Sequence, residues 1–507
     1  MQNYNPKRVL KNTLMLYIRY ILVMFVSLFT VRIVFSALGA YNYGVYNVVA
    51  GIVLLCGFLS GVMAAASQRY FSFDLGQNNL DKLSKTFSTT LLIYFILILI
   101  VFVLAQTIGL WWVNNKLIIE QERMFAANII YQTAIISFLI TLLSTPYKAL
   151  ITAHEDMKVY AYVGLLEVFL KFALAYILYI FMGDKLIIYG ILMLAVSIII
   201  FMTYYFYCAF KYTESKYHFY WDKKLFWEIV SYSSWNLFGN ISTIIKNQGI
   251  TIMFNMFYGP LLNAAQNIAI QIRGAINSFA NNFSTALKPQ ITKTYAAKEY
   301  KEMFTLVNIG SKITYFLLLI IIVPIFYNLD YLISLWLKEV PQWTVVLSKL
   351  TLLEVLFESI SYPMATANQA TGKIALYQTV IGCCVLMNLP IDYILLKIGR
   401  PPYEVYIVGC IIMLMLSFIR FVFLKRIEGF ALKPFFKNVI WPLFLTSIVL
   451  FCISYLVKLN INFSFIGACL DISVKFIISL FFIFLLGFTK AEKKKILNLI
   501  QQKLNRR

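Results

Sequence analysis

The chain has little charge and almost no histidine for its length. Only 13% of its 507 residues are Asp, Glu, Lys or Arg, 61% are apolar or aromatic, and two are histidines. A soluble chain of this size needs a much larger polar fraction to cover the surfaces of several domains. The composition therefore excludes a soluble multidomain protein and predicts a polytopic, all-α membrane protein.

Recognisable catalytic and metal-binding motifs are also missing. The seven cysteines are scattered through apolar runs without a CxxC pair, so neither a disulfide framework nor a zinc site is predicted. His154 and His218 lie in different loops and cannot form a metal site alone. Gly372-Lys373 lacks the upstream glycine and the Ser or Thr of a phosphate-binding loop. We therefore expect no catalytic residue, no metal, no cofactor and no enzyme activity.

Acidic residues are half as numerous as basic ones, 22 against 44. This excess of cations could suggest a nucleic-acid partner, but the cations lie mainly in short gaps between apolar runs, as in the inner loops of membrane proteins. A spanning helix needs about 20 mainly apolar residues. The chain offers fourteen such segments: 14–36, 45–66, 87–111, 125–145, 159–182, 186–209, 228–257, 262–286, 304–327, 344–368, 374–396, 403–424, 436–457 and 463–487.

The alternation of basic loops predicts the orientation of these spans. Lys and Arg are concentrated in every second loop, and these are the cytoplasmic loops if both termini are cytoplasmic. An odd number of spans is not consistent with this pattern. No cleavage site follows the first apolar run, so we expect Met1 to stay in the chain. The basic tail 490–507 either lies on the anionic inner leaflet or is a solvated topology signal.

The sequence contains a weak internal repeat. A shift of 220 residues places Gly39 on Gly259 and Asn47 on Asn267, and Tyr189-Gly190 faces Val408-Gly409 at a shift of 219. Pro146 and Pro363 take similar places after the fourth and tenth spans. Six spans followed by six in the same orientation predict two lobes that enclose a cavity. The expected parts are lobe 1–212, lobe 213–435, extra spans 436–489 and the tail 490–507.

The eighth span is the least apolar. Its polar residues recur at steps of three and four, so they share one helix face; among them are Asn263, Gln266, Asn267, Gln271, Asn277, Ser278 and Asn281. Unsatisfied amides are too costly to face lipid. The face is therefore either packed through hydrogen bonds within the bundle or lines a wet cavity that binds a ligand with many hydroxyls.

Several cations lie inside the spans, where charge is costly and usually faces the bundle interior or water. Lys246 and Arg273 lie well inside spans seven and eight, which suits an anionic ligand group. Arg19 and Arg32 are both close enough to a membrane face to snorkel, so a cavity role and snorkelling remain open for them.

Acidic residues inside the spans are fewer. Glu167 and Lys171 are i,i+4 neighbours, and we expect them to neutralise each other. Glu354 and Glu358 form an acidic pair on the tenth span. They either share a proton and couple transport to an ion, or they are tied to the cavity cations.

Four stretches resemble a known family. ALGAYNYGVYNVVAG (37–51), SQRYFSFDLG (67–76), TPYKALITAHEDM (145–157) and VYAYVGLLEVFLK (159–171) are similar to the Wzx-type polysaccharide and O-antigen flippases of the MOP superfamily, which have a MATE-like fold. The likeness covers most of spans one to twelve. It implies movement of an undecaprenyl-diphosphate-linked oligosaccharide to the outer leaflet of the bacterial inner membrane by alternating access, for O-antigen, capsule or exopolysaccharide biosynthesis.

The resemblance also implies roles for particular residues. Arg19, Arg32, Lys246 and Arg273 would be the cavity cations that bind the diphosphate, with Arg69 and Lys148 near the cytoplasmic mouth. The amide face of the eighth span would bind the sugars, through Asn267, Gln271, Asn277 and Asn281. The expected partners are the lipid-linked oligosaccharide, membrane lipids and the polymerase and other assembly proteins of the same pathway, with no nucleic acid.

Three alternatives can be weighed against the residues. A multidrug exporter of the same superfamily typically carries an acidic residue in its first span, where this chain has Arg19 and Arg32. A lipid II flippase differs only in the sugar it recognises. A membrane glycosyltransferase or polymerase usually needs a long outer loop or clustered carboxylates, and the sequence has neither.

Overall fold

The computed structural model describes residues 6–54, 57–115, 117, 119–337, 340–427, 430–457, 465–489, 492 and 493. Within these ranges the secondary structure is helical. The chain divides into two compact units, residues 1–240 and 241–507. This boundary lies within one long helix, whereas the expected lobes meet at residues 212 and 213. The expected tail 490–507 lies almost entirely outside the described residues.

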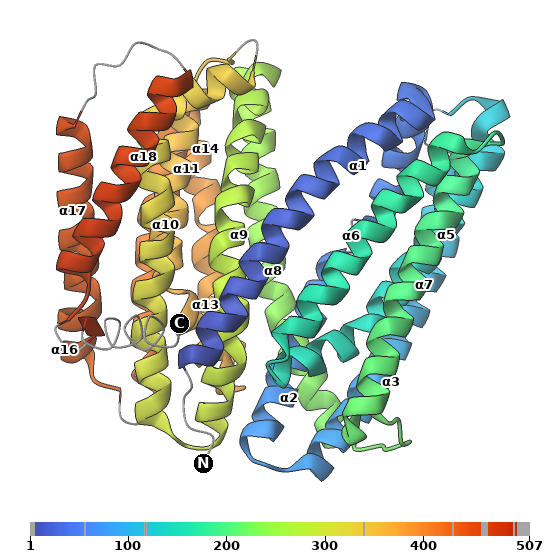
Figure 1. Cartoon of the computed structure of the whole chain (residues 1–507), viewed down its shortest axis with the longest axis horizontal. Coiled ribbons are helices and arrows are strands. Elements are labelled where there is room, and N and C mark those ends of the chain that lie inside the picture. The colour runs from blue at the N-terminus through green and yellow to red at the C-terminus, as the bar shows by residue number, and fades with distance from the viewer. Residues whose placement is uncertain are drawn as a thin grey trace, which may run out of the picture. The chain divides into compact units, whose positions relative to one another are not determined.

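Unit 1 is built around α5, which packs against α1, α2, α3 and α7 (Figure 1). Its elements are α1 (Pro6–Leu54), α2 (Gly57–Gly76), α3 (Leu80–Leu104), η1 (Ala105–Gly109), α4 (Leu110–Asn115), α5 (Gln121–Ala153), α6 (Met157–Ile180), α7 (Lys185–Lys211) and η2 (Thr213–Ser215). The buried core includes Ile130, Ile135 and Leu142 of α5. Helix α8 (Lys223–Tyr258) begins in unit 1 and ends in unit 2.

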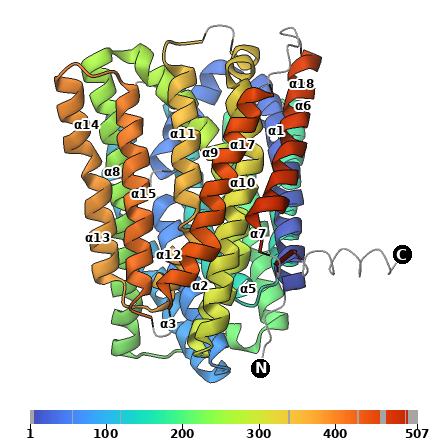
Figure 2. The same ribbon diagram turned by 90° about the vertical axis from the view of Figure 1, so that its left-hand side faces the viewer.

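Unit 2 contains the second part of α8 and the elements that follow it. Its elements are α9 (Pro260–Ala296), α10 (Tyr300–Trp336), α11 (Thr344–Ser359), α12 (Tyr362–Ala370), α13 (Ala375–Leu386), α14 (Asn388–Lys397), α15 (Tyr403–Leu424), α16 (Leu432–Phe435), η3 (Phe436–Ile440), α17 (Trp441–Leu456), α18 (Phe465–Phe482) and η4 (Ile483–Gly487). Figure 2 shows α13 and α14 end to end, as two halves of one segment.

Backbone turns recur at the spacing of the sequence repeat. Gly39, inside α1, and Gly259, just before α9, have φ angles of 75° and 77° with extended ψ angles. Asn78 and Lys298 have φ angles of 53° and 61° in the turns after α2 and α9. Positive φ is uncommon outside glycine. Its recurrence at a shift of 220 confirms that the two units repeat one plan.

Proline interrupts the corresponding helix of each unit. Pro146 lies inside α5 and cannot donate a backbone hydrogen bond to the preceding turn. Just before this proline, the hydroxyls of Ser144 and Thr145 donate to the Thr141 carbonyl, at 2.7 and 3.0 Å. Pro363 lies in the first turn of α12, after the break that ends α11. The repeated prolines thus give α5 an internal irregularity and divide its counterpart into α11 and α12.

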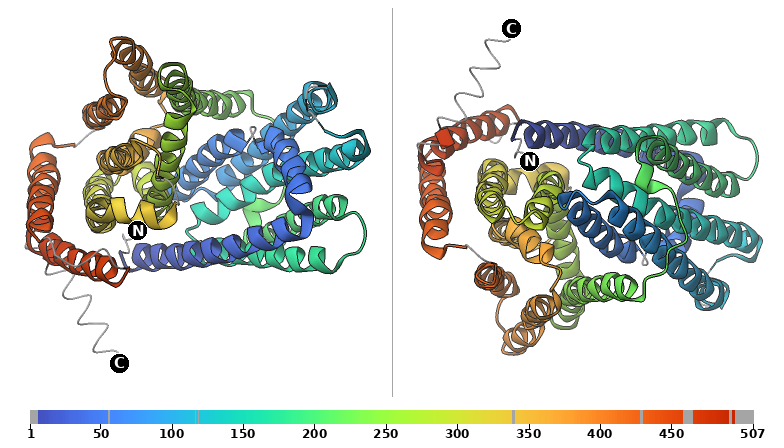
Figure 3. Two further views of the ribbon diagram at one scale, coloured as in Figure 1. Left: turned by 90° about the horizontal axis from the view of Figure 1, so that it is seen from above. Right: turned by 90° about the horizontal axis from the view of Figure 1, so that it is seen from below.

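The two extra helices, α17 and α18, pack on α10 within unit 2 (Figure 3). The Lys475 ammonium pairs with Asp471 on α18, and the Asn328 amide of α10 donates to the same carboxylate at 2.6 Å. Fully satisfied polar groups of this kind can hold helices together where lipid provides no hydrophobic drive.

Among the described residues, ten helices are long and apolar enough to cross a membrane, and they coincide with ten of the fourteen expected spans. The other four expected spans fall on the end of α1 with α2, on α8, on α9 and on α11 with α12. Many large apolar side chains on the helices are exposed, such as Leu99, Ile108 and Phe169. A surface this apolar needs lipid rather than water around it, so the chain is a multi-pass membrane protein.

Candidate functional site

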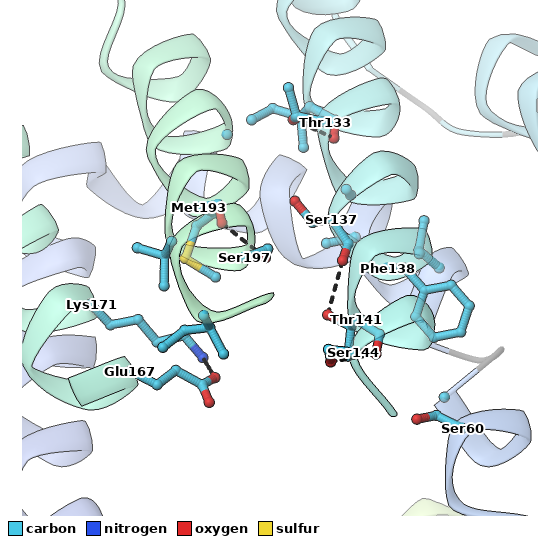
Figure 4. Close-up of a pocket in the computed structure, with 18 of the residues that line it drawn as sticks. Ser60, Thr133, Ser137, Phe138, Thr141, Ser144, Glu167, Lys171, Met193 and Ser197 are labelled. Carbon is cyan, nitrogen blue, oxygen red and sulfur yellow. Dashed lines mark hydrogen bonds and ion pairs between the residues drawn. The ribbon is translucent and has the colours of Figure 1, made fainter. Parts of the chain in front are cut away.

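Unit 1 contains a partly open cavity of about 400 Å³, called here the unit 1 cavity. Its walls come from the second part of α1, α2, α5, α6 and α7. Thr133, Ser137, Thr141 and Ser144 occupy one face of α5, since they follow each other at steps of four, four and three residues. Figure 4 shows this hydroxyl row facing Met193 and Ser197 of α7, with Ser60 of α2 nearby. The cavity is therefore polar along α5 and lies within a shell of apolar helices.

Gly190 lets α7 approach the hydroxyl row closely. A Cβ atom at this position would lie 2.6 Å from the Thr133 hydroxyl and 2.7 Å from the Ile130 Cδ1 atom. Such contacts are too short to exist, so only glycine fits without a shift of its neighbours. The Gly190 to Gly409 match of the repeat has a structural counterpart, since Gly409 lines a smaller pocket of unit 2.

Lys148, Glu167 and Lys171 line the unit 1 cavity, and Arg19 interacts electrostatically with Glu167 without lining the cavity; these four residues are called here the Glu167 cluster. The Lys171 ammonium lies 2.6 Å from the Glu167 carboxylate, as the i,i+4 spacing predicts. Lys148 interacts electrostatically with all three of the others. Three positive charges face one negative charge, so the cluster carries a net positive charge.

Two members of the Glu167 cluster lack a carboxylate of their own. Among the described residues, the ammonium of Lys148 forms no ion pair, and lies 5.2 Å from the centre of the Tyr204 ring. The guanidinium of Arg19 lies 4.7 Å from the centre of the Tyr160 ring and against Gly164 of α6. Cations held by aromatic rings keep their charge available to an anion.

The remaining basic candidates of unit 1 lie elsewhere. Arg32 is exposed on α1 and does not line the cavity. Arg69 lies among aromatic rings, 4.6 Å from the ring centre of Tyr70 and 4.8 Å from that of Phe73. Arg32 and Arg69 are therefore not brought together with the Glu167 cluster, and their assignment as binding residues stays a prediction.

Unit 2 contains a balanced charge network, called here the Glu354 cluster. Glu354 of α11 accepts from Lys246 of α8 at 2.9 Å and from Arg273 of α9 at 2.6 Å. The other nitrogen of the Arg273 guanidinium binds Glu358 at 2.9 Å. Lys246 and Glu354 are 5% and 2% exposed. The charges of two cations and two carboxylates cancel in this cluster. Of the two expected arrangements, the structure has the one in which Glu354 and Glu358 pair with the cations.

The Glu354 cluster borders a small space. A pocket of about 60 Å³ is lined by Lys246, Gln266, Arg273 and Glu354, among others. Nearby on α14, Asp392 is 0% exposed, and neither of its carboxyl oxygens has a hydrogen-bond partner in the described chain. The pocket is large enough for one or two waters, so a larger ligand would need the cluster to open.

The polar surface of α9 divides into two neighbouring faces. Gln266 and Arg273 turn toward the Glu354 cluster, and Asn277 accepts a hydrogen bond from the Tyr362 hydroxyl at 2.7 Å. Asn267, Gln271 and Asn281 form the second face and are exposed. Exposed amides cannot face lipid without a large cost. The second face therefore meets water or a polar ligand, whereas the first provides hydrogen bonds within the bundle.

The TPYKALITAHEDM stretch ends in a polar cluster at the turn between α5 and α6. Asp156 accepts from Lys211 at 2.6 Å and from the Tyr212 hydroxyl. Burial alone would raise the pKa of Asp156, but these two hydrogen bonds outweigh it and leave the pKa below its usual value. Glu214 lies 2.6 Å from His154, and this partner likewise outweighs burial and lowers the pKa of Glu214.

Part of the SQRYFSFDLG stretch is explained by packing. Asp74 is buried, accepts from the Thr86 hydroxyl at 2.6 Å and pairs with Lys82 at 3.1 Å. The Ser67 hydroxyl lies 3.3 Å from that of Tyr94. Both interactions join α2 to α3. These motif residues therefore hold helices together and do not face the cavity.

Sequence reasoning did not identify the hydroxyl row of α5. The signal is present, because Thr133, Ser137, Thr141 and Ser144 recur at steps of four, four and three residues on one face of a mainly apolar span. Ser and Thr inside helices commonly bond the preceding turn of their own helix, as Thr141 does to the Ser137 carbonyl. A hydroxyl row alone therefore does not distinguish a cavity wall from ordinary helix packing.

The chain is similar to known proteins in two respects. A model of the MatE family matches residues 236–394. A solved MATE structure in the bent conformation shares 13% identity, covers 83% of this chain and 95% of its own, and has a TM-score of 0.72. An outward-facing multidrug resistance MATE family transporter of the MOP superfamily shares 14% identity over 83% of this chain and 96% of its own, with a TM-score of 0.68.

A third solved structure is a MOP superfamily transporter from Pyrococcus furiosus, described as having a binding pocket of reversed polarity that suggests a different function. It shares 14% identity over 83% of this chain and 96% of its own, with a TM-score of 0.66. No curated protein matches the sequence. The chain thus has the fold of the MATE transporters.

Proposed function

We propose that this MATE-fold protein is a transporter that moves an anionic, lipid-linked oligosaccharide across the bacterial cytoplasmic membrane. The cargo would be an undecaprenyl-diphosphate-linked oligosaccharide of O-antigen, capsule or exopolysaccharide biosynthesis. Transport would proceed by alternating access, from the inner to the outer leaflet, with both termini in the cytoplasm. The polymerase and other assembly proteins of that pathway would be its partners.

The net positive charge of the Glu167 cluster carries this proposal. Arg19 and Lys148 are held by aromatic rings and not by carboxylates, and Glu167 is already paired with Lys171. A positive site in a low-dielectric surrounding attracts anions and repels cations. A diphosphate fits this site, whereas a cationic drug does not.

The exposed face of α9 supports the saccharide part of the cargo. Asn267, Gln271 and Asn281 each offer both donors and acceptors, which is the pattern that sugar hydroxyls need. Their exposure on a helix of a membrane protein requires a polar environment. The four stretches that resemble the Wzx-type flippases favour the same cargo class.

A multidrug exporter is the second candidate, since a solved neighbour with this fold is a multidrug resistance transporter. The Glu354 cluster is electrically balanced and contains two carboxylates, so it does not by itself repel a cationic drug. The sign of charge at the unit 1 cavity favours the flippase over the exporter. A lipid II flippase shares the diphosphate chemistry and differs in its sugar and peptide.

Reconstitution into liposomes tests the proposal. The purified protein is reconstituted together with an undecaprenyl-diphosphate oligosaccharide, and the cargo exposed on each side is measured with a membrane-impermeant glycosidase. We expect the protein to accelerate translocation over protein-free liposomes, and not to accelerate movement of ethidium. Faster movement of lipid II than of the oligosaccharide would identify the lipid II alternative.

Two results would contradict the proposal. Translocation of ethidium with no translocation of either lipid-linked cargo would assign the protein to the exporters. Equal translocation by wild type and by a variant carrying Arg19→Gln and Lys148→Gln would remove the positive cluster from the mechanism. The matched control is Lys158→Gln, because Lys158 is an exposed cation in the first turn of α6 and does not line the cavity.

A further inference from the structure

The connection between α7 and α8 exposes a cluster of large aromatic side chains. Residues 216–227 are called here the aromatic connection. Four of their aromatic side chains are between 47% and 77% exposed: Tyr217, Phe219, Trp221 and Trp227. The Phe226 ring contacts both tryptophans, with its centre 5.1 Å from that of Trp221 and 5.6 Å from that of Trp227. The rings thus form an apolar patch of the kind that marks a contact with a partner or a membrane.

Several interactions hold the aromatic connection against unit 1. The backbone N–H of His218 donates to the Ser88 hydroxyl of α3 at 3.2 Å, and the Lys85 ammonium of α3 lies 5.2 Å from the centre of the Tyr220 ring. At the other end, the Asp222 carboxylate accepts from two backbone N–H groups of the first turn of α8, at 2.8 and 3.2 Å. The exposed rings are therefore held in a defined position beside α3 and α8.

The aromatic connection lies where two spans end. Helix α7 is long and apolar enough to cross a membrane and ends at Lys211, shortly before the connection. Ser88, which binds His218, lies at the start of the apolar run of α3 that is expected to span the membrane, 87–111. The connection therefore lies at the level of the lipid headgroups. Trp and Tyr are enriched at this level, and lysine side chains can reach the lipid phosphates from it.

Unpaired cations accompany the rings. Three lysines of the aromatic connection are exposed and have no ion pair among the described residues: Lys216, Lys223 and Lys224. Lys85 adds a fourth cation, against the carboxylates of Asp222 and the neighbouring Glu228. The surface therefore carries a net positive charge next to its rings. Exposed cations beside apolar rings are the combination that binds the surface of an anionic membrane.

We infer that the aromatic connection is a binding surface for the anionic phospholipids of the leaflet at which α7 ends. Its exposed rings enter the boundary between headgroups and acyl chains, and its three unpaired lysines bind the lipid phosphates. With both termini in the cytoplasm, as proposed, this is the cytoplasmic leaflet. The occupant is bilayer lipid and not cargo, so the inference goes beyond the proposed function. Since α8 begins here and continues into unit 2, the surface fixes the start of the helix that joins the two units.

Photo-crosslinking of the full-length protein tests the inference at one position. Phe219 is 77% exposed and is replaced by p-benzoylphenylalanine, an aromatic residue that reacts with neighbouring C–H bonds under ultraviolet light. The protein is reconstituted into liposomes of phosphatidylcholine with a minority of phosphatidylglycerol, both with the same acyl chains, and mass spectrometry identifies the adducts. We expect lipid adducts in which the ratio of phosphatidylglycerol to phosphatidylcholine exceeds that of the liposome about fivefold or more, since each lysine near an anionic surface contributes roughly this factor.

The matched control position is Phe95, which is also exposed but lies in the uncharged run 87–111 of α3. Crosslinking at this position should give lipid adducts in the proportions of the liposome, because the acyl chains of the two lipids are the same. The comparison of the two positions therefore separates contact with lipid in general from selection of the anionic headgroup.

Loss of the lysine charges should abolish the enrichment. In the protein crosslinked at position 219, the ratio should fall to that at position 95 when three lysines are replaced together: Lys216→Gln, Lys223→Gln and Lys224→Gln. High salt should have the same effect without any substitution, because it screens exposed charges. The charge control replaces three exposed lysines of unit 2 and should leave the ratio unchanged: Lys298→Gln, Lys301→Gln and Lys425→Gln.

Four results would overturn the inference. Position 219 could give no lipid adduct, which would place the rings in water, or adducts with protein alone, which would make the surface a protein interface. The ratio of the two lipids could be the same at positions 219 and 95, or it could survive both high salt and the replacement of the three lysines. In either of the last two cases the lysines do not select anionic lipid.

Discussion

At the scale of single residues, the cations of the two units have opposite energetic roles. Lys246 is 5% exposed and bound to Glu354, so it neutralises a buried carboxylate. Lys148 has no ion pair among the described residues and contacts the Tyr204 ring. Removal of Lys246 leaves the buried carboxylate of Glu354 with one counter-charge fewer. Removal of Lys148 breaks no ion pair among the described residues, so it leaves no carboxylate unpaired. Sequence alone cannot make this distinction, because neither lysine has a carboxylate within four residues along the chain.

A paired substitution measures the role of Lys246. Lys246→Met should destabilise the protein by about 3 kcal/mol, because breaking a buried ion pair leaves the partner charge uncompensated. Adding Glu354→Gln should recover most of the loss, since Arg273 keeps its pair with Glu358. Thermal unfolding in detergent measures both. The control is Lys349→Met, whose exposed pair with Asp330 is worth only about 0–1 kcal/mol.

If the variant with both Lys246→Met and Glu354→Gln is no more stable than the variant with Lys246→Met alone, the explanation by a broken ion pair is wrong. Lys246 would then stabilise through packing of its methylene chain. Loss of transport in Lys246→Met must therefore be compared with the double variant before any ligand is assigned to Lys246. The pairing partners Glu354 and Glu358 were identifiable from sequence as an acidic pair, but the identity of their cations required the structure.

At the scale of helices, Gly39 and Gly259 mark equivalent bends. Their φ angles of 75° and 77°, with extended ψ angles, belong to a region that only glycine occupies at low cost. Each opens onto free space where a Cβ atom would be. A substitution there therefore adds backbone strain without a steric clash.

Alanine at these bends tests the repeat energetically. Gly39→Ala and Gly259→Ala should each lower the free energy of unfolding by about 1–3 kcal/mol. Gly274→Ala is the matched control: it also has free space around the new Cβ atom but lies within α9, so alanine should be neutral or stabilising by about 1 kcal/mol. Melting curves in one detergent compare the three. Similar losses for all three would rule out strain at the bends.

The turn between α5 and α6 should respond to acid. Because the pKa of Asp156 in the folded protein lies below its unfolded value, its hydrogen bonds with Lys211 and Tyr212 stabilise the fold above the unfolded pKa of about 4. This contribution is lost as the pH falls through the folded pKa. Asp156→Asn should therefore lower the melting temperature at pH 7, and the difference from wild type should shrink near pH 3.

Thermal melts across this pH range check the prediction, with Glu228→Gln as the control at an exposed carboxylate of α8. A constant difference between wild type and Asp156→Asn at all pH values would mean that the asparagine disturbs packing and that the charge of Asp156 is unimportant. The residues of this turn, 154–156, belong to a stretch that was recognised in the sequence. Tyr212, which donates a hydrogen bond to Asp156, lies beyond the end of α7, so sequence spacing could not identify it as the partner of Asp156.

At the scale of the whole molecule, hydropathy and the repeat predicted the fold well. Ten expected spans coincide with long apolar helices, and the matched glycines Gly39 and Gly259 have the same backbone angles. These features depend on local composition and on copies of one plan, so the sequence contains them directly. The unit 1 cavity does not follow from such patterns, because residues of five helices that lie far apart in the sequence line it together.

The final prediction joins charge to transport. A variant with Arg19→Gln and Lys148→Gln leaves Lys171 and Glu167 as a neutral pair, so the Glu167 cluster no longer attracts an anion. We expect transport of the lipid-linked oligosaccharide to fall by about tenfold or more, since hydrogen bonds to charged groups are each worth about 1.5–3 kcal/mol. Stability should be unchanged or higher, because neither cation has an ion pair with any residue that the structure describes, and an unpaired charge away from water is costly.

This combination of lost transport and kept stability distinguishes a binding residue from a packing residue. Proteoliposome transport and thermal unfolding are measured on the same preparations, with Lys246→Met as the contrasting variant that should lose stability. If the double variant unfolds at a clearly lower temperature, the two cations stabilise unit 1 through contacts that the rings at Tyr160 and Tyr204 provide. The positive charge of the unit 1 cavity would then be a consequence of packing, and the attraction of an anionic cargo would have to come from elsewhere in the chain.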